Sequence, residues 1–313
     1  MRIVFFGTPE FAVPSLEAVA GAGHEVLLVV SRPDQPAGRS MRLTAPAMVA
    51  AARRLGLPVA QPEKLGAEEF VGRLRGLPAE LAVVVAFGRL LAPRLLAIPP
   101  RGFVNLHPSL LPRHRGPSPI ESAILRGDEE TGVTTMLLDE GMDTGPILLQ
   151  RATPIGARER SPELERRLAL MGAELVVETL AALAIGAVTP RRQDNARATV
   201  TQKLDRKMAR IDWGLDAAEL ARRCRAFDPW PGLFASFRQS RVKVHGLEVA
   251  APAPAPGGEA PGTVLQVSSD GILVRCGGDT PGLLTELQRE GRRRLPADAF
   301  ILGERVARGE RFS

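Results

Sequence analysis

The stretch Leu81-Ala82-Val83-Val84-Val85-Ala86 is the most informative segment for the fold, because every one of its positions is apolar. A strand with one face in water alternates apolar and polar residues, whereas a parallel strand covered on both faces is apolar almost throughout. The segment therefore predicts a buried parallel strand over residues 80–86, with helices on both faces of its sheet.

Short apolar runs of the same kind lie on both sides of this strand, separated by stretches with helical periodicity. Strands are predicted over residues 2–6, 25–30 and 102–106, and helices over residues 10–22, 46–55 and 161–184. This alternation is typical of βαβ units. We therefore predict an α/β domain with a mostly parallel, Rossmann-like sheet. The loop after the first strand lacks the G-x-G-x-x-G pattern of a dinucleotide-binding site.

The C-terminal third of the chain has a different pattern. A helix is predicted over residues 215–227, followed by short strands over residues 241–245, 262–267 and 271–276. Short strands separated by turn residues indicate a small β-barrel or sandwich. The predicted organisation is therefore a first domain over residues 1–189, a polar linker over 190–207 and a smaller domain over 208–313.

Composition limits the class of protein. The chain has 313 residues, of which 44% are hydrophobic and 24% charged, a balance typical of a globular protein without membrane spans. Two cysteines without metal-ligand spacing suit a reducing cytosol, so we expect a cytoplasmic protein without a metal. The net charge of +6 favours an anionic partner, but an arginine-rich genome explains it equally well.

Two polar residues lie at the end of the strand predicted over residues 102–106. Asn105 and His107 are two positions apart, so their side chains share one face of the strand. A carboxamide and an imidazole at the carboxyl edge of a parallel sheet can donate hydrogen bonds to a developing oxyanion, and the imidazole can also carry protons. An ordinary capped strand end is the alternative.

An acidic loop follows the next predicted strand, over residues 132–138. Asp139-Glu140-Gly141-Met142-Asp143-Thr144-Gly145 has the composition of a tight turn. An aspartate from this loop can pair with His107 and orient its ring. An acidic surface turn and a metal site are the alternatives, and the lack of further ligands disfavours the metal.

Taken together, Asn105-Leu106-His107-Pro108-Ser109-Leu110-Leu111-Pro112, Arg115-Gly116 and residues 132–145 resemble the signature of the 10-formyltetrahydrofolate-dependent formyltransferase family. The resemblance implies that Asn105, His107 and Asp143 are the catalytic residues. It also implies direct attack of an amine on the formyl carbon. Asn105 and protonated His107 would hold the oxyanion of the tetrahedral intermediate, and Asp143 would orient His107.

The same resemblance implies a folate site beside these residues, with 10-formyltetrahydrofolate as formyl donor and no metal. Family members usually have tyrosine where this chain has Phe87, which removes one hydroxyl group from that site. The expected folate-binding residues are Phe87, Gly88, Leu90, Leu91, Ser109, Leu110, Leu111, Pro112, Leu138 and Asp139.

Two features indicate the formyl acceptor. Thr8-Pro9-Glu10 replaces the Gly/Ser-rich phosphate loop of the relatives that act on phosphoribosyl amines. Residues 31–43 contain Pro33-Asp34-Gln35-Pro36-Ala37-Gly38-Arg39, which resembles the insertion that family members acting on initiator Met-tRNA use to reach the acceptor stem. The resemblance thus implies formylation of the methionyl amino group of initiator Met-tRNA.

Residues 209–213 and 225–232 resemble the start of that subfamily's C-terminal domain, which is an OB-like, tRNA-binding β-barrel. Residues 201–313 carry 18 lysines and arginines against 14 acidic residues. Candidate tRNA contacts are Arg39, Arg42, Arg206, Lys207, Arg292, Arg293 and Arg294. The family resemblance implies a monomer. Sugar-nucleotide formyl transfer, formyltetrahydrofolate hydrolysis and RNA binding without catalysis are the rival functions.

Overall fold

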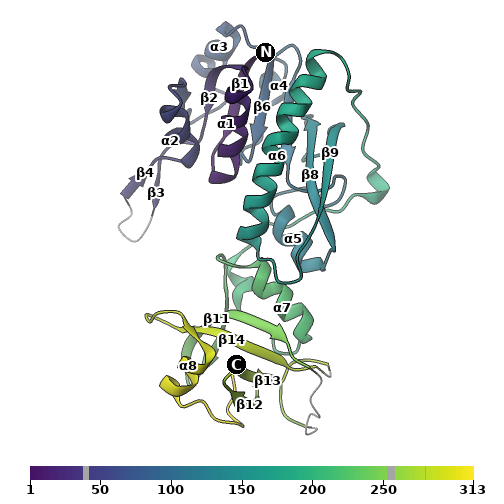
Figure 1. Ribbon diagram of the computed structural model, residues 1–313. Helices are drawn as coiled ribbons and strands as arrows, with labels where there is room; N and C mark the ends of the chain where they lie inside the picture. Colours follow the sequence, from purple (N-terminus) through teal and green to yellow (C-terminus); the bar gives the residue numbers. More distant parts are fainter. Residues whose placement is uncertain (38–41, 252–257, 279) are drawn as a thin grey trace. The chain divides into compact units, whose positions relative to one another are not determined.

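A computed structural model describes residues 1–37, 42–251, 258–278 and 280–313, which form two compact units (Figure 1). The first unit contains Met1–Pro119, Glu130–Pro154 and Leu164–Thr201. The second contains Ile120–Glu129, Ile155–Glu163 and Gln202–Ser313. Two short segments that precede residue 164 therefore belong to the second unit, an arrangement that the sequence pattern did not predict.

The first unit is built on a seven-stranded sheet. Its order is β5 (Val59–Ala60), β2 (Glu25–Val30), β1 (Arg2–Gly7), β6 (Leu81–Val85), β7 (Phe103–His107), β8 (Glu130–Leu137) and β9 (Ile147–Pro154). Neighbouring strands from β5 to β7 are parallel, whereas β8 is antiparallel to both β7 and β9. The predicted mostly parallel sheet is confirmed, and β6 is buried along its whole length as expected.

Helices cover both faces of this sheet. The helical elements of this unit are η1 (Glu10–Ala12), α1 (Val13–Gly21), α2 (Ala47–Arg54), α3 (Glu68–Gly76), α4 (Pro93–Leu96), α6 (Ser161–Ala184), which belongs to it from Leu164 onward, and η2 (Asn195–Arg197). On one face, Phe6 and Val84 pack with Phe70 of α3 and Leu95 of α4. On the other face α6 crosses the strands (Figure 1), and a Cβ atom added at Gly172 would come within 2.5 Å of the Leu106 side chain.

A two-stranded ribbon extends from this unit after β2. It consists of β3 (Gln35–Ala37) and β4 (Arg42–Thr44), in antiparallel register from Gln35 with Thr44 to Ala37 with Arg42. The insertion predicted to contact tRNA therefore begins and ends as paired strands. Arg39 lies outside the described residues.

The second unit combines an antiparallel sheet with short helices. The strand order is β10 (Leu233–Phe237), β11 (Ser240–Val249), β14 (Gly282–Arg289), β13 (Gly271–Val274) and β12 (Val264–Ser268), with β15 (Leu295–Pro296) beside β14. The helices are α5 (Pro119–Arg126), which belongs to this unit from Ile120 onward, η3 (Arg206–Ala209), α7 (Ala217–Ala226) and α8 (Ala297–Glu304).

The strand pairing of this second sheet is an open path, but the C-terminal tail contacts both of its edges. Phe312 bridges Phe237 of β10, and Arg311 bridges Thr263 beside β12. The rings of Phe312 and Phe237 are stacked with their centroids 4.5 Å apart. A smaller, separate β-domain is thus confirmed as an antiparallel sheet.

Candidate active site

Asn105 and His107 lie side by side on β7, where the apolar core gives way to polar groups. Both are buried, with 9% and 4% of their surfaces exposed. The Nε2 of His107 donates a hydrogen bond to the carbonyl oxygen of His114 over 2.9 Å, since a carbonyl can only accept. Among the described residues the carboxamide of Asn105 has no hydrogen-bond partner, so its donors are available to a bound molecule.

Asp143 approaches the same imidazole from the loop after β8. One of its carboxylate oxygens lies 3.6 Å from Nδ1 of His107 and accepts a hydrogen bond from the backbone N–H of Gly116 over 2.8 Å. The Asp143 side chain keeps 16% of its surface exposed. The three residues predicted as catalytic therefore come together in the first unit.

The loop that carries Asp143 is fixed by its own short-range contacts. One oxygen of Asp139 accepts hydrogen bonds from the backbone of Gly141 and from the Thr144 hydroxyl, over 3.0 and 2.7 Å. Gly145 lets the chain turn back, because a Cβ atom there would lie 1.8 Å from the carbonyl oxygen of Leu137. The sequence Asp-Glu-Gly-Met-Asp-Thr-Gly thus forms a tight turn that presents Asp143.

The loop after β7 is held from its other side by Thr134 of β8. The hydroxyl of Thr134 donates to the carbonyl oxygen of Ser109 over 2.6 Å and accepts from the backbone N–H of Leu111 over 3.2 Å. The Ser109 hydroxyl donates to the carbonyl oxygen of Arg113 over 2.6 Å. These bonds fix the course of the chain from His107 to His114.

The site therefore offers a set of complementary groups. Asn105 contributes buried amide donors, and Asp143 contributes a partly exposed acceptor. Because Nε2 of His107 is protonated in its bond to the carbonyl, Nδ1 is the ring nitrogen that gains or loses a proton, beside the carboxylate. Such an arrangement can stabilise an oxyanion and move a proton without a covalent intermediate.

The predicted folate residues of the 87–91 loop differ in accessibility. Phe87 lies in the core with 2% of its surface exposed, and its ring meets that of Phe6 edge-on at 5.3 Å. Its carbonyl oxygen accepts a hydrogen bond from the Thr8 hydroxyl over 3.1 Å. Leu90, in contrast, is 78% exposed, and Leu91 is half-buried. In this structure Leu90 and Leu91 have side chains that a ligand can reach.

The remaining predicted folate residues surround the catalytic loops. Leu111 packs with Met136 and Ile147, and Leu138 lies against this small cluster. Ser109 and Leu111 are buried, Asp139 is exposed, and Leu110, Pro112 and Leu138 are intermediate. Gly88 adopts a φ of 73°, a conformation that favours glycine.

The predicted tRNA contacts are scattered over the surface. Arg206 and Lys207 are exposed on η3, and Arg292 and Arg293 are exposed between β14 and β15. Arg294 forms an ion pair with Glu286. Arg42 pairs through its backbone with Ala37.

Two residues at the site were missed by the sequence reasoning. Gln193, in the segment predicted as a linker, donates to the carbonyl oxygens of Asp143 and Gly145 over 2.8 and 2.7 Å. Its own oxygen accepts from Nε of Arg115, a buried arginine that also donates to Asn195. Arg115-Gly116 in the family signature was the available signal, but nothing in the local pattern marks Gln193.

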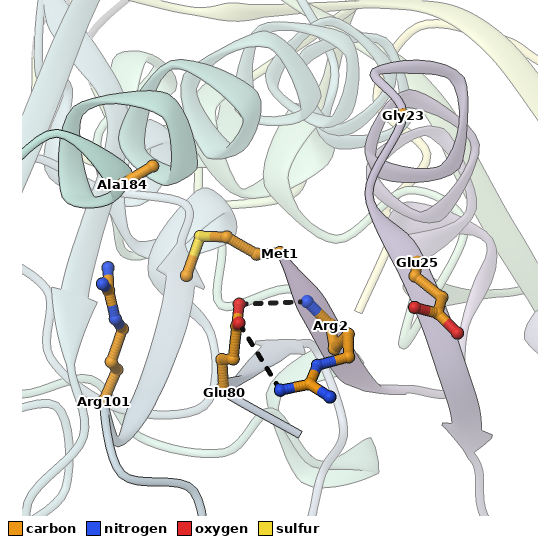
Figure 2. A pocket seen from close by; sticks show the side chains of 7 residues that line it. All are labelled: Met1, Arg2, Gly23, Glu25, Glu80, Arg101 and Ala184. Atoms are coloured by element: carbon orange, nitrogen blue, oxygen red, sulfur yellow. Dashed lines mark hydrogen bonds and ion pairs between the residues drawn. The ribbon is translucent and has the colours of Figure 1, made fainter. Parts of the chain in front are cut away.

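A surface pocket of the first unit, of about 440 Å³, lies at the amino ends of the parallel strands (Figure 2), whereas Asn105 and His107 lie toward the carboxyl end of β7. Its lining residues come from the amino ends of β1 and β2, from the positions before β6 and β7 and from the end of α6: Met1, Arg2, Gly23, Glu25, Glu80, Arg101 and Ala184. Glu80 accepts from the backbone of Arg2 and pairs with its guanidinium. The pocket includes none of the predicted site residues.

The described residues include no cluster of three or more metal-ligating side chains. Within the same part of the chain, none of the helices combines the length and the apolar character required to cross a membrane.

Comparison with known proteins defines the class. Residues 1–180 match the model of the formyl transferase family, and residues 203–305 match that of the formyl transferase C-terminal domain. The HypX structure from Aquifex aeolicus in complex with tetrahydrofolic acid superposes with a TM-score of 0.62 at 19% identity, covering 96% of this chain. This chain spans about half of the HypX chain, 47% of its length. The site therefore lies in a formyltransferase fold.

Relatives of full length define the family more closely. The methionyl-tRNA formyltransferase of Citrifermentans bemidjiense is 42% identical over 309 residues, which cover 99% of this chain and 95% of the relative. That of Anaeromyxobacter sp. (strain K) is 47% identical over 312 residues, covering 100% and 99%. The chain belongs to the methionyl-tRNA formyltransferase family.

Proposed function

We propose that this chain transfers the formyl group of 10-formyltetrahydrofolate to the methionyl amino group of initiator Met-tRNA, a step of translation initiation. The observation that carries the proposal is the identity of 42 to 47%, along the whole chain, with relatives that are named methionyl-tRNA formyltransferase. We place the reaction at Asn105 and His107 of β7 and at Asp143, whose carboxylate lies near His107.

The proposed reaction begins with attack of the neutral methionyl amine on the formyl carbon. The carbonyl oxygen becomes an oxyanion, for which the amide of Asn105 and Nδ1–H of protonated His107 are the donors. Nδ1 lies 3.6 Å from the Asp143 carboxylate, too far for a strong hydrogen bond, so its N–H can donate to the oxyanion. Asp143 keeps the imidazolium oriented.

Proton movement completes the transfer. The attacking nitrogen loses one proton, and N10 of the folate gains one as the bond between N10 and the formyl carbon breaks. The partly exposed carboxylate of Asp143 and a water molecule are suited to relay this proton. The products are formyl-methionyl-tRNA and tetrahydrofolate, and no bond forms to the protein.

We propose that folate binds between the 87–91 loop and the loops that carry the catalytic residues. Leu90 and Leu91 would form apolar walls, and Asp139 lies exposed on the opposite loop. Gly88, Ser109, Leu110, Leu111, Pro112 and Leu138 would contribute mainly backbone groups and shape. Since the Phe87 side chain is part of the core, its contribution would come from its backbone.

For tRNA binding we propose Arg39 and Arg42 of the insertion after β2, together with Arg206, Lys207 and Arg292–Arg294. The functional division would be a catalytic domain over residues 1–189, a linker over 190–207 and a tRNA-binding domain over 208–313. We propose that this last domain is an OB-like barrel. The support is that the C-terminal tail pairs with β10 and with the residue before β12, the two edges of the sheet.

We further propose that the protein acts as a cytoplasmic monomer. The family resemblance supports the monomer, and sparse cysteines with buried thiols suit a reducing compartment.

The test is an acceptor assay with radiolabelled 10-formyltetrahydrofolate. Initiator Met-tRNA, elongator Met-tRNA and a nucleotide-linked amino sugar are offered separately, and released formate is measured. We expect label on initiator Met-tRNA, and about a hundredfold less in the same time with the Asp143→Asn variant. Label on the amino sugar alone, or release of formate alone, would refute the proposed acceptor.

A further inference from the structure

Gln193 joins the catalytic turn to the chain around His114. Its carboxamide nitrogen donates to the carbonyl oxygens of Asp143 and Gly145 over 2.8 and 2.7 Å, which uses both of its protons. Its oxygen accepts from Nε of Arg115 over 2.9 Å. One half-buried side chain thus satisfies three groups at two loops.

The Asp143 turn needs such support. Asp143 has a φ of 55°, in the left-handed region that residues other than glycine seldom adopt. Its backbone carbonyl points at Gln193 while its carboxylate accepts from Gly116 and faces His107. Gln193 therefore holds the backbone that determines where the carboxylate lies.

Arg115 connects Gln193 to the second hydrogen-bonding partner of His107, which is the carbonyl of His114. Its guanidinium is buried and donates to Gln193 and Asn195 over 2.9 Å each. The preceding residue, His114, supplies the carbonyl that accepts from Nε2 of His107. Both partners of the imidazole, the carbonyl and Asp143, are thus linked through Gln193 and Arg115.

The backbone beyond Gln193 completes this link. Arg115 donates to the carbonyl oxygen of Thr199 and accepts from the backbone N–H of Thr201, each over 2.8 Å. The hydroxyl of Thr199 accepts from the backbone of His114 over 2.8 Å. Residues 193–201 therefore brace both catalytic loops.

We propose that Gln193 is a positioning residue for formyl transfer. It keeps Asp143 and the carbonyl of His114 in their places beside the two ring nitrogens of His107. The inference rests on the function proposed above. Gln193 does not touch His107, so it acts through Asp143 and Arg115. Its effect is on the rate of the reaction within the bound complex rather than on substrate binding.

The variant Gln193→Glu separates the two halves of this contact. Glutamate keeps an acceptor for Arg115 but replaces both donors to the Asp143 turn with a negatively charged oxygen. We expect kcat to fall at least about tenfold with the KM of each substrate changed less than about threefold, as misplaced catalytic groups produce. Ala181→Glu, which adds the same charge at an exposed position of α6, serves as the control and should keep wild-type kinetics.

A double-mutant cycle distinguishes positioning from general stability. If Gln193 acts through Asp143, adding Gln193→Glu to Asp143→Asn lowers kcat little further, whereas independent effects multiply. Multiplied effects, or a Gln193→Glu kcat within about threefold of wild type, would overturn the proposal. Gln193→Met, which keeps the length without polar groups, repeats the test should the glutamate variant unfold.

Hydrogen exchange at the Gly116 amide provides a measurement independent of activity. This N–H is bonded to the Asp143 carboxylate, so its protection reports the position of that side chain. We expect exchange to quicken in Gln193→Glu but not in Ala181→Glu, and unchanged exchange would overturn the proposal. If wild-type enzyme fails to formylate Met-tRNA while this exchange behaves as expected, the proposed function fails and the structural brace stands.

Discussion

Replacement of Asp143 by asparagine is the sharpest perturbation of the proposed catalytic site. It removes one negative charge 3.6 Å from Nδ1 of His107 and leaves the size of the side chain almost unchanged. Asparagine can still accept the hydrogen bond from Gly116 through its oxygen. That same oxygen faces Nδ1 of His107, so the variant keeps an acceptor there and loses the negative charge.

The structure sets the size of the expected effect. Two unit charges at this separation attract by about 4 to 5 kcal/mol at an effective dielectric constant of about 20. The 16% exposed carboxylate is partly screened, and the asparagine dipole retains part of the attraction. A net loss of about 2 to 3 kcal/mol in the transition state lowers the rate about thirtyfold to a hundredfold or more.

The measurement is kcat for initiator Met-tRNA under saturating folate, with the melting temperature as a control of folding. We expect kcat to fall by about two orders of magnitude while the KM values stay within about threefold of wild type. A variant that folds normally and keeps more than about a third of the wild-type kcat would refute the role assigned to the carboxylate.

Three further results are expected. His107→Ala removes an oxyanion donor and should lower kcat about a hundredfold or more; near-normal turnover would exclude His107 from catalysis. Arg39→Ala should raise the KM for Met-tRNA but not for folate and reduce the salt dependence of tRNA binding by a slope of about 1; equal kinetics would mean that Arg39 does not contact RNA. Burial raises the pKa of both Cys224 and Cys276 from 9.0 to about 11. Because only the thiolate reacts, their alkylation at pH 8 should be about a hundredfold slower in the native protein than after unfolding, and rapid native labelling would contradict their buried state.

Much of the first unit follows from its sequence because its strands are buried on both faces. The continuous apolar run at residues 81–86 corresponds to β6, and the periodic pattern over 161–184 corresponds to α6 with the same bounds. It was harder to predict which segments of the chain belong to which unit. Residues 120–129 and 155–163 belong to the second unit through contacts distant in sequence, which local periodicity does not encode.

The placement of the candidate catalytic residues was predictable for a different reason. Asn105 and His107 share one strand, so alternation alone places them together, and the Asp143 turn is recognisable by its glycines. Gln193 lies 50 residues beyond Asp143 in a polar stretch without periodicity. Its role depends on a backbone conformation at Asp143 and on a parallel bridge between Arg115 and Val200, neither of which leaves a local sequence pattern.

The charge of the second unit shows why composition is a weak guide to RNA contacts. Several of its arginines are committed to carboxylates of the same unit, including Arg223 with Glu219, Arg289 with Glu304 and Arg294 with Glu286. Such pairs contribute little net electrostatic field. An arginine that must leave its carboxylate to bind a phosphate also loses part of the free energy that it gains from the phosphate. Some exposed cations pair with no carboxylate among the described residues, and they are therefore better candidates for phosphate contacts than Arg294: Arg206, Lys207, Arg292 and Arg293. Local pairing, rather than the net excess of positive charge, determines where an RNA backbone gains most from this surface.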